Sequence, residues 1–199
     1  MSSRPIPHAQ AARFRRLAWP LMSVVLRTAE CLTRSRDQAE DLAQETMLKA
    51  ARAIDSYQDG TDMRSWLLTI MRRTHIDWLR TRRHRPTHLS LNAEELDVLS
   101  QEDQQPGRFD EQWEEPEELM ERFDDETVID ALRVLPDEIR WTLLLVDIEQ
   151  MEQVEAAKVL GVPVGTIKSR THRGRAMLRD RLYEHAVHRG WVDSKEGSR

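Results

Sequence analysis

Cysteine is nearly absent, since Cys31 is the only one among 199 residues. A single cysteine cannot form a disulfide within the chain, and its place in the apolar run 26–32 predicts a buried small side chain. No apolar run approaches the ~20 residues that span a bilayer, and no apolar signal-peptide core follows Arg4 and Pro5. We therefore expect a soluble, cytoplasmic protein without membrane insertion.

The sequence also lacks the motifs of common nucleic-acid enzymes. It has no P-loop, no nucleophile motif and no cluster of cysteine and histidine at metal-ligand spacing. His75, His84 and His88 are loosely clustered, but no acidic or cysteine partner accompanies them at such spacing. An enzyme acting on nucleic acid is therefore a weak alternative, and we expect no catalytic residue, no metal and no cofactor.

Sustained period-two alternation with β-branched residues is missing as well, which predicts an all-α fold. The first eleven residues are predicted to lack structure, Pro20 to bend the first helix, and segment 57–63 to form a loop. Helices are predicted over residues 12–32, 36–54, 64–82, 124–135, 137–148, 153–160 and 164–185.

The net charge of -5 is distributed very unevenly. Segment 92–126 contains fifteen Asp and Glu against two Arg, a local charge of -13, which leaves +8 on the rest of the chain. This segment is rich in acidic residues, contains two prolines and shows little helical period, so it is predicted to be a flexible acidic linker. The chain is thus predicted to comprise two small helical domains, 12–86 and 124–184, joined by residues 87–123.

Segment 153–178 has the pattern of a helix-turn-helix. Ala156 and Ala157 provide small side chains where the two helices cross. Gly161 tolerates the left-handed backbone of the turn, and Pro163 presets φ at the start of the second helix. The joint occurrence of these residues predicts a DNA-binding motif.

The second helix of this motif has two different faces. Ile167, Thr171 and Leu178 are predicted to face the core, and Gly174 to allow close approach. The opposite face is basic, as expected of a helix that enters the major groove of DNA. Its stripe consists of Lys168, His172, Arg175 and Arg179, with Arg170 and Arg173 beside it.

Two further surfaces are predicted in the N-terminal half. Trp66 opens a helix that becomes rich in arginine and contains Trp78, a combination that suits phosphates and unstacked bases. Trp66 is explained more simply as core, whereas Trp78 fits either role. The preceding helix has a polar face, which is either solvated or a docking surface for a helical partner.

Three segments together resemble the extracytoplasmic-function (ECF) sigma factors, the small two-domain branch of the sigma-70 family. Residues 37–50 resemble the family's segment for binding core RNA polymerase. Residues 64–80 resemble its melting and minus-ten segment, with Arg73 where many members carry Asn, and residues 160–178 resemble its minus-thirty-five reader. The resemblance covers roughly residues 13–182, and the order and spacing of the three segments make it specific.

The resemblance implies a non-enzymatic sigma factor whose partners are core RNA polymerase, promoter DNA and an anti-sigma factor. The N-terminal domain (region 2) would dock on the polymerase and capture a minus-ten base, and the C-terminal domain (region 4) would read the minus-thirty-five element as duplex. The linker would thread through the polymerase toward the RNA exit, where its charge either matches a basic channel or only keeps a tether extended.

The resemblance also implies residues for each role. The polymerase-binding residues would be Asp37, Glu40, Asp41, Gln44, Glu45 and Lys49. The minus-ten and melting residues would be Trp66, Arg72, Arg73, Asp77, Trp78, Arg80, Arg82 and Arg83. The minus-thirty-five readers would be Gly165, Thr166, Lys168, Ser169, Arg170, His172, Arg173 and Arg175.

A stand-alone helix-turn-helix transcriptional regulator is the main alternative. It accounts for the C-terminal half, but it leaves the polar face of 36–54 and the arginine-rich helix without a role. Binding to core RNA polymerase distinguishes the two interpretations, because a stand-alone repressor would not bind it.

Overall fold

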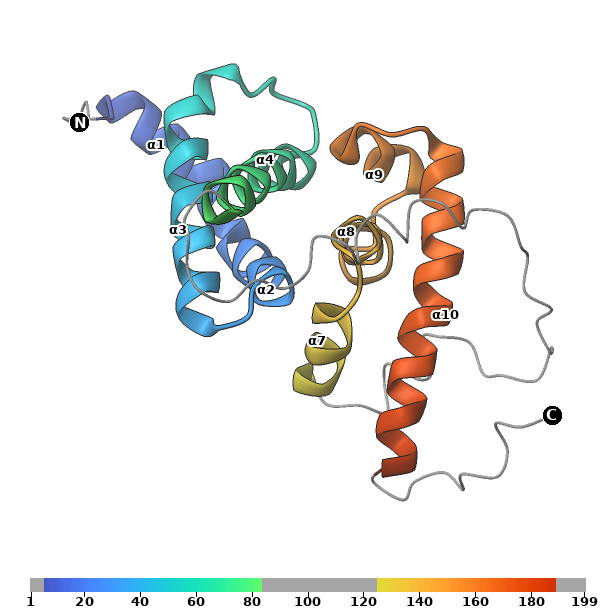
Figure 1. Cartoon of the computed structure of the whole chain (residues 1–199). Coiled ribbons are helices and arrows are strands. Elements are labelled where there is room, and N and C mark those ends of the chain that lie inside the picture. Colours follow the sequence, from blue (N-terminus) through green and yellow to red (C-terminus); the bar gives the residue numbers. More distant parts are fainter. Residues whose placement is uncertain (1–5, 84–124, 189–199) are drawn as a thin grey trace.

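The computed structural model describes residues 6–83 and 125–188, and every regular element in these ranges is helical (Figure 1). The first range contains α1 (His8–Leu17), the 3₁₀ turn η1 (Trp19–Leu21), α2 (Met22–Leu32), α3 (Arg36–Ala53), the 3₁₀ turn η2 (Ile54–Ser56) and α4 (Met63–Arg83). The second contains α7 (Asp125–Arg133), α8 (Asp137–Leu143), the π-helical turn η3 (Leu144–Ile148), α9 (Gln153–Leu160) and α10 (Val164–His188). The all-α prediction is confirmed, and the predicted linker 87–123 lies outside the described residues.

The start of the first helix was predicted wrongly, because α1 begins at His8 rather than at residue 12. Long-range contacts explain the difference. Gln10 pairs with Asp55, and the Arg13 guanidinium donates to the carbonyl oxygens of Ile54 and Tyr57 at 3.0 and 2.9 Å. These bonds join α1 to residues more than forty positions away in the sequence. The local hydrophobic periodicity from which helices are predicted does not reveal such contacts. The predicted bend at Pro20 is confirmed, since η1 separates α1 from α2.

Helix α3 packs against both α2 and α4, and its sequence explains which face it buries. Ser35 caps the first turn, where its hydroxyl accepts a hydrogen bond from the Gln38 N–H at 3.4 Å. Small and apolar residues then recur at intervals of three and four, which forms one continuous stripe. The buried residues are Ala39, Leu42, Ala43, Thr46, Met47, Ala50 and Ala51. The acidic residues of α3 are left on the opposite side.

The second half contains the predicted helix-turn-helix in α9 and α10. Ala156 and Ala157 are buried where the helices cross, and Gly161 has a φ of +63°. The Val162 N–H closes the turn by donating to the Ala157 carbonyl at 3.1 Å. Because left-handed φ is costly for residues that carry a Cβ, the glycine is what allows this tight turn.

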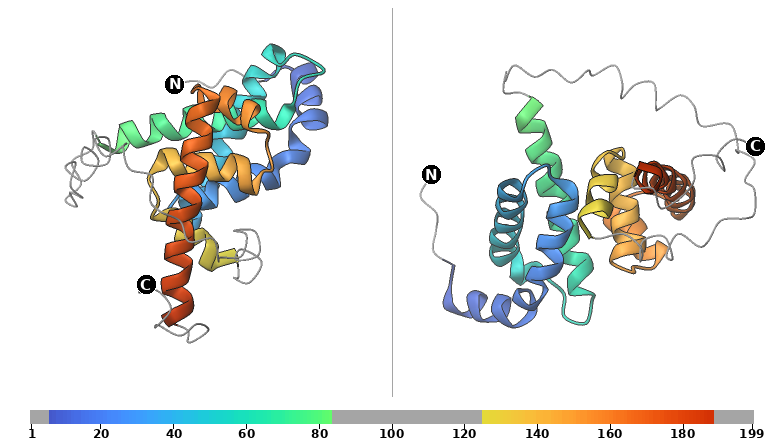
Figure 2. Two further views of the ribbon diagram at one scale, coloured as in Figure 1. Left: turned by 90° about the vertical axis from the view of Figure 1, so that its right-hand side faces the viewer. Right: turned by 90° about the horizontal axis from the view of Figure 1, so that it is seen from below.

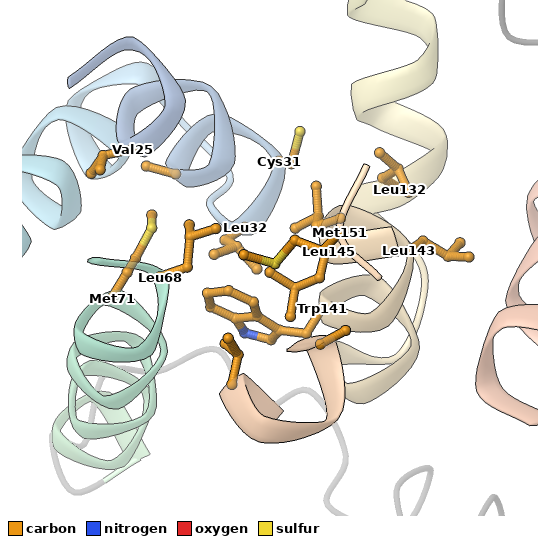
Figure 3. Packing of buried hydrophobic residues seen from close by; sticks show 14 of the residues in the cluster. Val25, Cys31, Leu32, Leu68, Met71, Leu132, Trp141, Leu143, Leu145 and Met151 are labelled. Carbon is orange, nitrogen blue, oxygen red and sulfur yellow. The ribbon is translucent and has the colours of Figure 1, made fainter. Parts of the chain in front are cut away.

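The two halves share one continuous apolar core. The side chains that meet at the junction include Leu32, Leu68 and Met71 from the first half and Trp141, Leu145 and Met151 from the second (Figure 3). Helix α4 packs against α9, and α2 packs against α7 and α8. In Figure 2 the second half lies against α2 and α4, with α10 on its outer side. The sequence predicted two domains, but it did not predict this contact.

Gly174 of α10 tests the packing of the second half. A Cβ at this position would lie 2.6 Å from Ile139 Cγ2 and 3.0 Å from Leu143 Cγ, and both of these side chains are buried. We expect Gly174→Ala to lower the free energy of unfolding by about 1–3 kcal/mol, measured by chemical denaturation. Gly165→Ala in the same helix is the control, because its added Cβ meets nothing within 4 Å. Equal losses from the two substitutions would contradict the packing explanation.

Candidate nucleic-acid and protein interfaces

The predicted polymerase-binding face lies on the outer side of α3. Its exposed members are Asp37, Glu40, Asp41, Gln44 and Glu45. Lys49 is partly buried, and its Nζ lies 3.0 Å from Glu45 Oε1 and 4.0 Å from Asp77 Oδ2 of α4. The helices that pack against α3 are α1, α2 and α4, so the second half leaves this face accessible.

An apolar hollow adjoins the same face. It has a volume of about 790 Å³ and lies between α1, α2 and α3. Phe14, Met22 and Met47 line it, together with Trp19 and Leu48, whose side chains are exposed. Large exposed apolar side chains beside a charged surface are typical of a protein interface.

The predicted minus-ten residues of α4 fall into an exposed group and a partly buried group. Arg73, Asp77 and Arg80 are exposed, whereas Arg72 and Trp78 are partly buried. Burial lowers the pKa of Arg72, and Arg170 from the other half lowers it further while Glu138 opposes this. Helix α4 includes Arg82 and Arg83, whose side chains lie outside the described part of the structure.

Trp66 packs against the core, as its pattern predicted. Its ring is partly buried and meets the ring of Tyr57 edge-on, with 5.5 Å between centroids. The ring of Trp78 lies 6.4 Å from that of His75. Both tryptophans of α4 are therefore partly buried and lie against another aromatic ring.

The predicted reading face of α10 is largely exposed. Gly165, Lys168, Ser169, His172 and Arg173 are exposed, and Thr166 is partly buried. Ile167, Thr171 and Leu178 are buried on the other side, as predicted. Helix α10 lies on the outer side of the second half (Figure 2). Arg170 nevertheless comes near the first half, because its charge acts on Arg72 of α4.

Two predicted readers are held by carboxylates that the sequence analysis did not identify. The Arg170 guanidinium pairs with Glu138 of α8. The Arg175 guanidinium binds Asp147 through Nη2 at 2.7 Å and Nε at 3.3 Å, a forked arrangement that fixes its orientation. The sequence predicts only a helix over 137–148, and the carboxylates of Glu138 and Asp147 within this otherwise apolar segment are the signal for this role.

Arginines of the second half bind the end of α2 across the junction. Arg133 Nη2 donates to the Glu30 carbonyl at 3.2 Å, and Arg140 Nη1 donates to the Leu32 carbonyl at 3.3 Å. Carbonyls in the last turn of a helix lack helical partners and carry partial negative charge. The two arginines therefore satisfy the C-terminus of α2.

Glu149 is the buried acid of the junction, with a side chain that is only 2% exposed. Its Oε1 lies 2.8 Å from Arg27 Nη2 of α2, and its Oε2 lies 3.9 Å from Arg64 Nη1 of α4. The same Arg64 nitrogen donates to the backbone carbonyl of Glu149 at 2.6 Å. Both arginines belong to the first half of the chain, and neither was predicted to have this role.

His75 is buried on α4 at the same junction. Trp141 Nε1 donates to His75 Nδ1 at 3.3 Å, which requires this nitrogen to be unprotonated. Burial lowers the pKa of His75 below its usual value of 6.5; Asp137 opposes this, and Arg140 adds to it. The ring is therefore neutral in the folded chain at neutral pH.

The lone cysteine is buried, as its place in an apolar run predicted. Burial raises the pKa of the Cys31 thiol to about 11, so it is a poor nucleophile. Within residues 6–83 and 125–188, no three His, Cys, Asp or Glu side chains are grouped to hold a metal ion. His84 and His88 lie outside the described residues. No helix in these ranges is long and apolar enough to cross a membrane.

Known protein families match both halves of the chain. Residues 14–85 match the family Sigma-70 region 2, and residues 125–178 match the family Sigma-70, region 4. The ECF RNA polymerase sigma factor SigE of Mycolicibacterium smegmatis is 35% identical over 162 residues, which are 81% of this chain and 58% of that protein. EcfG of Rhodopseudomonas palustris is 34% identical over 153 residues, which are 76% of this chain and 75% of that protein. The chain belongs to the ECF sigma factors of the sigma-70 family.

A solved relative extends the similarity to three dimensions. The sigma factor RpoE of Bartonella quintana, in complex with the anti-sigma factor NepR, matches with a TM-score of 0.61 and 27% sequence identity. The match covers 85% of this chain and 98% of that chain. This ECF sigma factor therefore has the fold that the resemblance implied, although it spans only 58% of the length of SigE.

The neutral state of His75 predicts how stability depends on pH. Because its pKa is lowered in the folded state, the unfolded chain binds the proton more readily. The stabilisation is complete above about pH 6.5 and is lost as pH falls below that value toward the folded-state pKa. Thermal unfolding between pH 7.5 and 5 should show this loss, and His75→Gln should reduce it. A slope that is identical in the variant would contradict the assignment to His75.

Proposed function

We propose that this chain is a sigma factor that binds core RNA polymerase and directs promoter-specific transcription initiation. It acts as a non-enzymatic subunit in the cytoplasm. The observation that carries this proposal is the order of family regions along one chain. A polar, exposed face on α3 and an arginine-rich α4 are followed by an exposed basic α10 in a helix-turn-helix.

The polymerase would dock on α3 through Asp37, Glu40, Asp41, Gln44 and Glu45, with Lys49 at the edge. Exposure of this face in the folded chain supports the docking role over a purely solvated one, because apolar surface continues beside it. Trp19 and Leu48 line that adjoining hollow and extend the surface available to the same partner. An acidic rim with an apolar neighbour suits an amphipathic helix with basic residues.

Promoter contacts would be divided between α4 and α10. Arg73 and Arg80 of α4 are exposed and suited to phosphates, and the partly buried Trp78 of the same helix offers an aromatic ring on which an extruded base can stack. Lys168 and Arg173 of α10 are exposed and suited to the major groove. An anti-sigma factor is a further partner, as in the solved complex of the Bartonella relative.

The central experiment is run-off transcription with core RNA polymerase on a promoter library. We expect transcripts from a defined set of promoters only when the chain and core polymerase are both present. A stand-alone regulator would neither bind core polymerase nor confer promoter selectivity on it. Tight, sequence-specific footprinting by the chain without polymerase would also contradict the proposal.

The reading helix provides a variant for the same assay. Arg173→Ala should lower transcription from a selected promoter about fivefold or more, since an arginine contact to a guanine contributes ~1–3 kcal/mol of discrimination. Arg181→Ala is the matched control, because Arg181 lies on the same helix beyond the predicted readers and is exposed. Equal transcription by the Arg173 variant and the wild type would show that this residue is not a reader.

The docking face provides a second variant. Asp41→Arg together with Glu45→Arg should weaken binding to core polymerase at least tenfold while far-UV circular dichroism stays unchanged, because like charges would then face a basic partner. The control variant is Glu126→Arg with Glu184→Arg, which makes the same change of net charge at exposed acids of the second half and should leave binding to core polymerase unchanged. Unchanged affinity for core polymerase in the first variant would favour the solvated-face interpretation.

A further inference from the structure

The arrangement of the two halves raises a geometrical problem for the proposed function. The minus-ten and minus-thirty-five elements are about 25 base pairs apart, which is ~85 Å of duplex. In this structure α4 packs directly against α9 of the helix-turn-helix. The melting helix and the reading domain are therefore in contact, and one chain in this conformation cannot reach both elements.

Opening is sterically possible, since residues 84–124 connect the halves. A chain of that length can extend to about 140 Å, which exceeds the distance between the elements. The conformation described here is therefore a closed one, and reading a promoter requires the halves to separate. What holds the closed conformation together decides when that happens.

The junction combines apolar packing with one buried ion cluster. Apolar contact alone is not directional, but the Glu149 carboxylate is 2% exposed and needs specific partners. Arg27 and Arg64 supply them, and both come from the opposite half. If either arginine were removed, the carboxylate would be left buried without full compensation, a situation that strongly destabilises folded proteins.

The two arginines are much more exposed than Glu149, which suits a reversible contact. Arg27 is about half exposed and Arg64 one third exposed, so water reaches both when the halves separate. Glu149 itself would become solvated on opening, as an ordinary surface acid is. The carboxylate and both guanidinium groups are therefore compensated in the closed conformation by one another and in the open conformation by water. The cluster opposes separation of the halves without preventing it.

The polymerase-binding face is not part of this junction. Asp41, Gln44 and Glu45 are exposed while the halves are closed. The face on α3 is therefore accessible to core polymerase whether the halves are closed or separated.

We propose that Glu149, held by Arg27 and Arg64, is a latch that keeps the unbound chain closed and unable to read both promoter elements at once. Its release accompanies assembly with core polymerase. This inference rests on the proposed function, but the latch itself is a property of the chain alone and can be measured without transcription.

Energy transfer between two dyes measures the latch directly. The full chain carries Ala12→Cys on α1 and Lys158→Cys on α9, both at exposed positions, with Cys31→Ala to remove the native thiol. We expect one high-transfer population in the wild type and a low-transfer population after addition of core polymerase. Glu149→Gln, which keeps the side-chain shape, should raise the ratio of open to closed molecules about tenfold.

Matched variants separate the latch from general loss of stability. Arg27→Gln should raise the open population as Glu149→Gln does, and the double variant should add little, because both break the same pair. Asp180→Asn is the control, since it removes an ion pair with Arg179 that lies within α10. Transfer in Glu149→Gln and Arg27→Gln that equals the wild type would overturn the latch.

Run-off transcription distinguishes this failure from failure of the proposed function. With the latch weakened, half-maximal transcription should need severalfold less chain at fixed core polymerase, because apparent affinity scales with the competent population. The maximal transcript yield should not change. Transcription by the wild type with unchanged energy transfer in the variants rejects the latch alone, whereas no transcription by any form rejects the proposed function.

Discussion

The packing of α4 is the constraint on which the rest of the structure depends. One side of this helix completes the core of the first half against α3, and another side meets α9 and the apolar segment around Trp141. Figure 3 shows Leu68 of α4 pointing toward Leu32 and Trp141, with Met71 on the side of Val25. A helix that is buried on two sides keeps only a narrow polar surface, which is where Arg73, Asp77 and Arg80 lie.

Polar groups fix the relative position of the two halves at the junction. Apolar packing alone, which is not directional, would allow several positions. The C-terminal carbonyls of α2, the His75 ring and the Glu149 carboxylate each meet a specific partner in the opposite half. Each group would be costly to bury alone. Together they define one relative position of the halves, and each can return to water when the halves part.

The fold was predictable from sequence wherever the signal was local. The turn glycine Gly161, the small pair Ala156 and Ala157, and the buried stripe of α3 follow from spacing, and the resemblance of three segments implied the family. The start of α1 and the contact between the halves were not predictable, because they depend on Arg13 and Glu149 bonding to residues far away in the sequence. The site assignments themselves remain predictions, although the exposed faces of α3 and α10 agree with them.

The π-helical turn η3 limits which sequence changes the segment Leu144–Ile148 can tolerate. Asp147, inside the turn, binds Arg175 of α10, and Glu149, just after it, binds the arginines of the other half. Residues two positions apart point to opposite sides of a helical turn, so the two carboxylates reach opposite neighbours. Deleting one residue here would rotate everything beyond it by about 100° and detach one carboxylate or the other. Insertions and deletions should therefore be far less tolerated across Leu144–Ile148 than substitutions that keep its length.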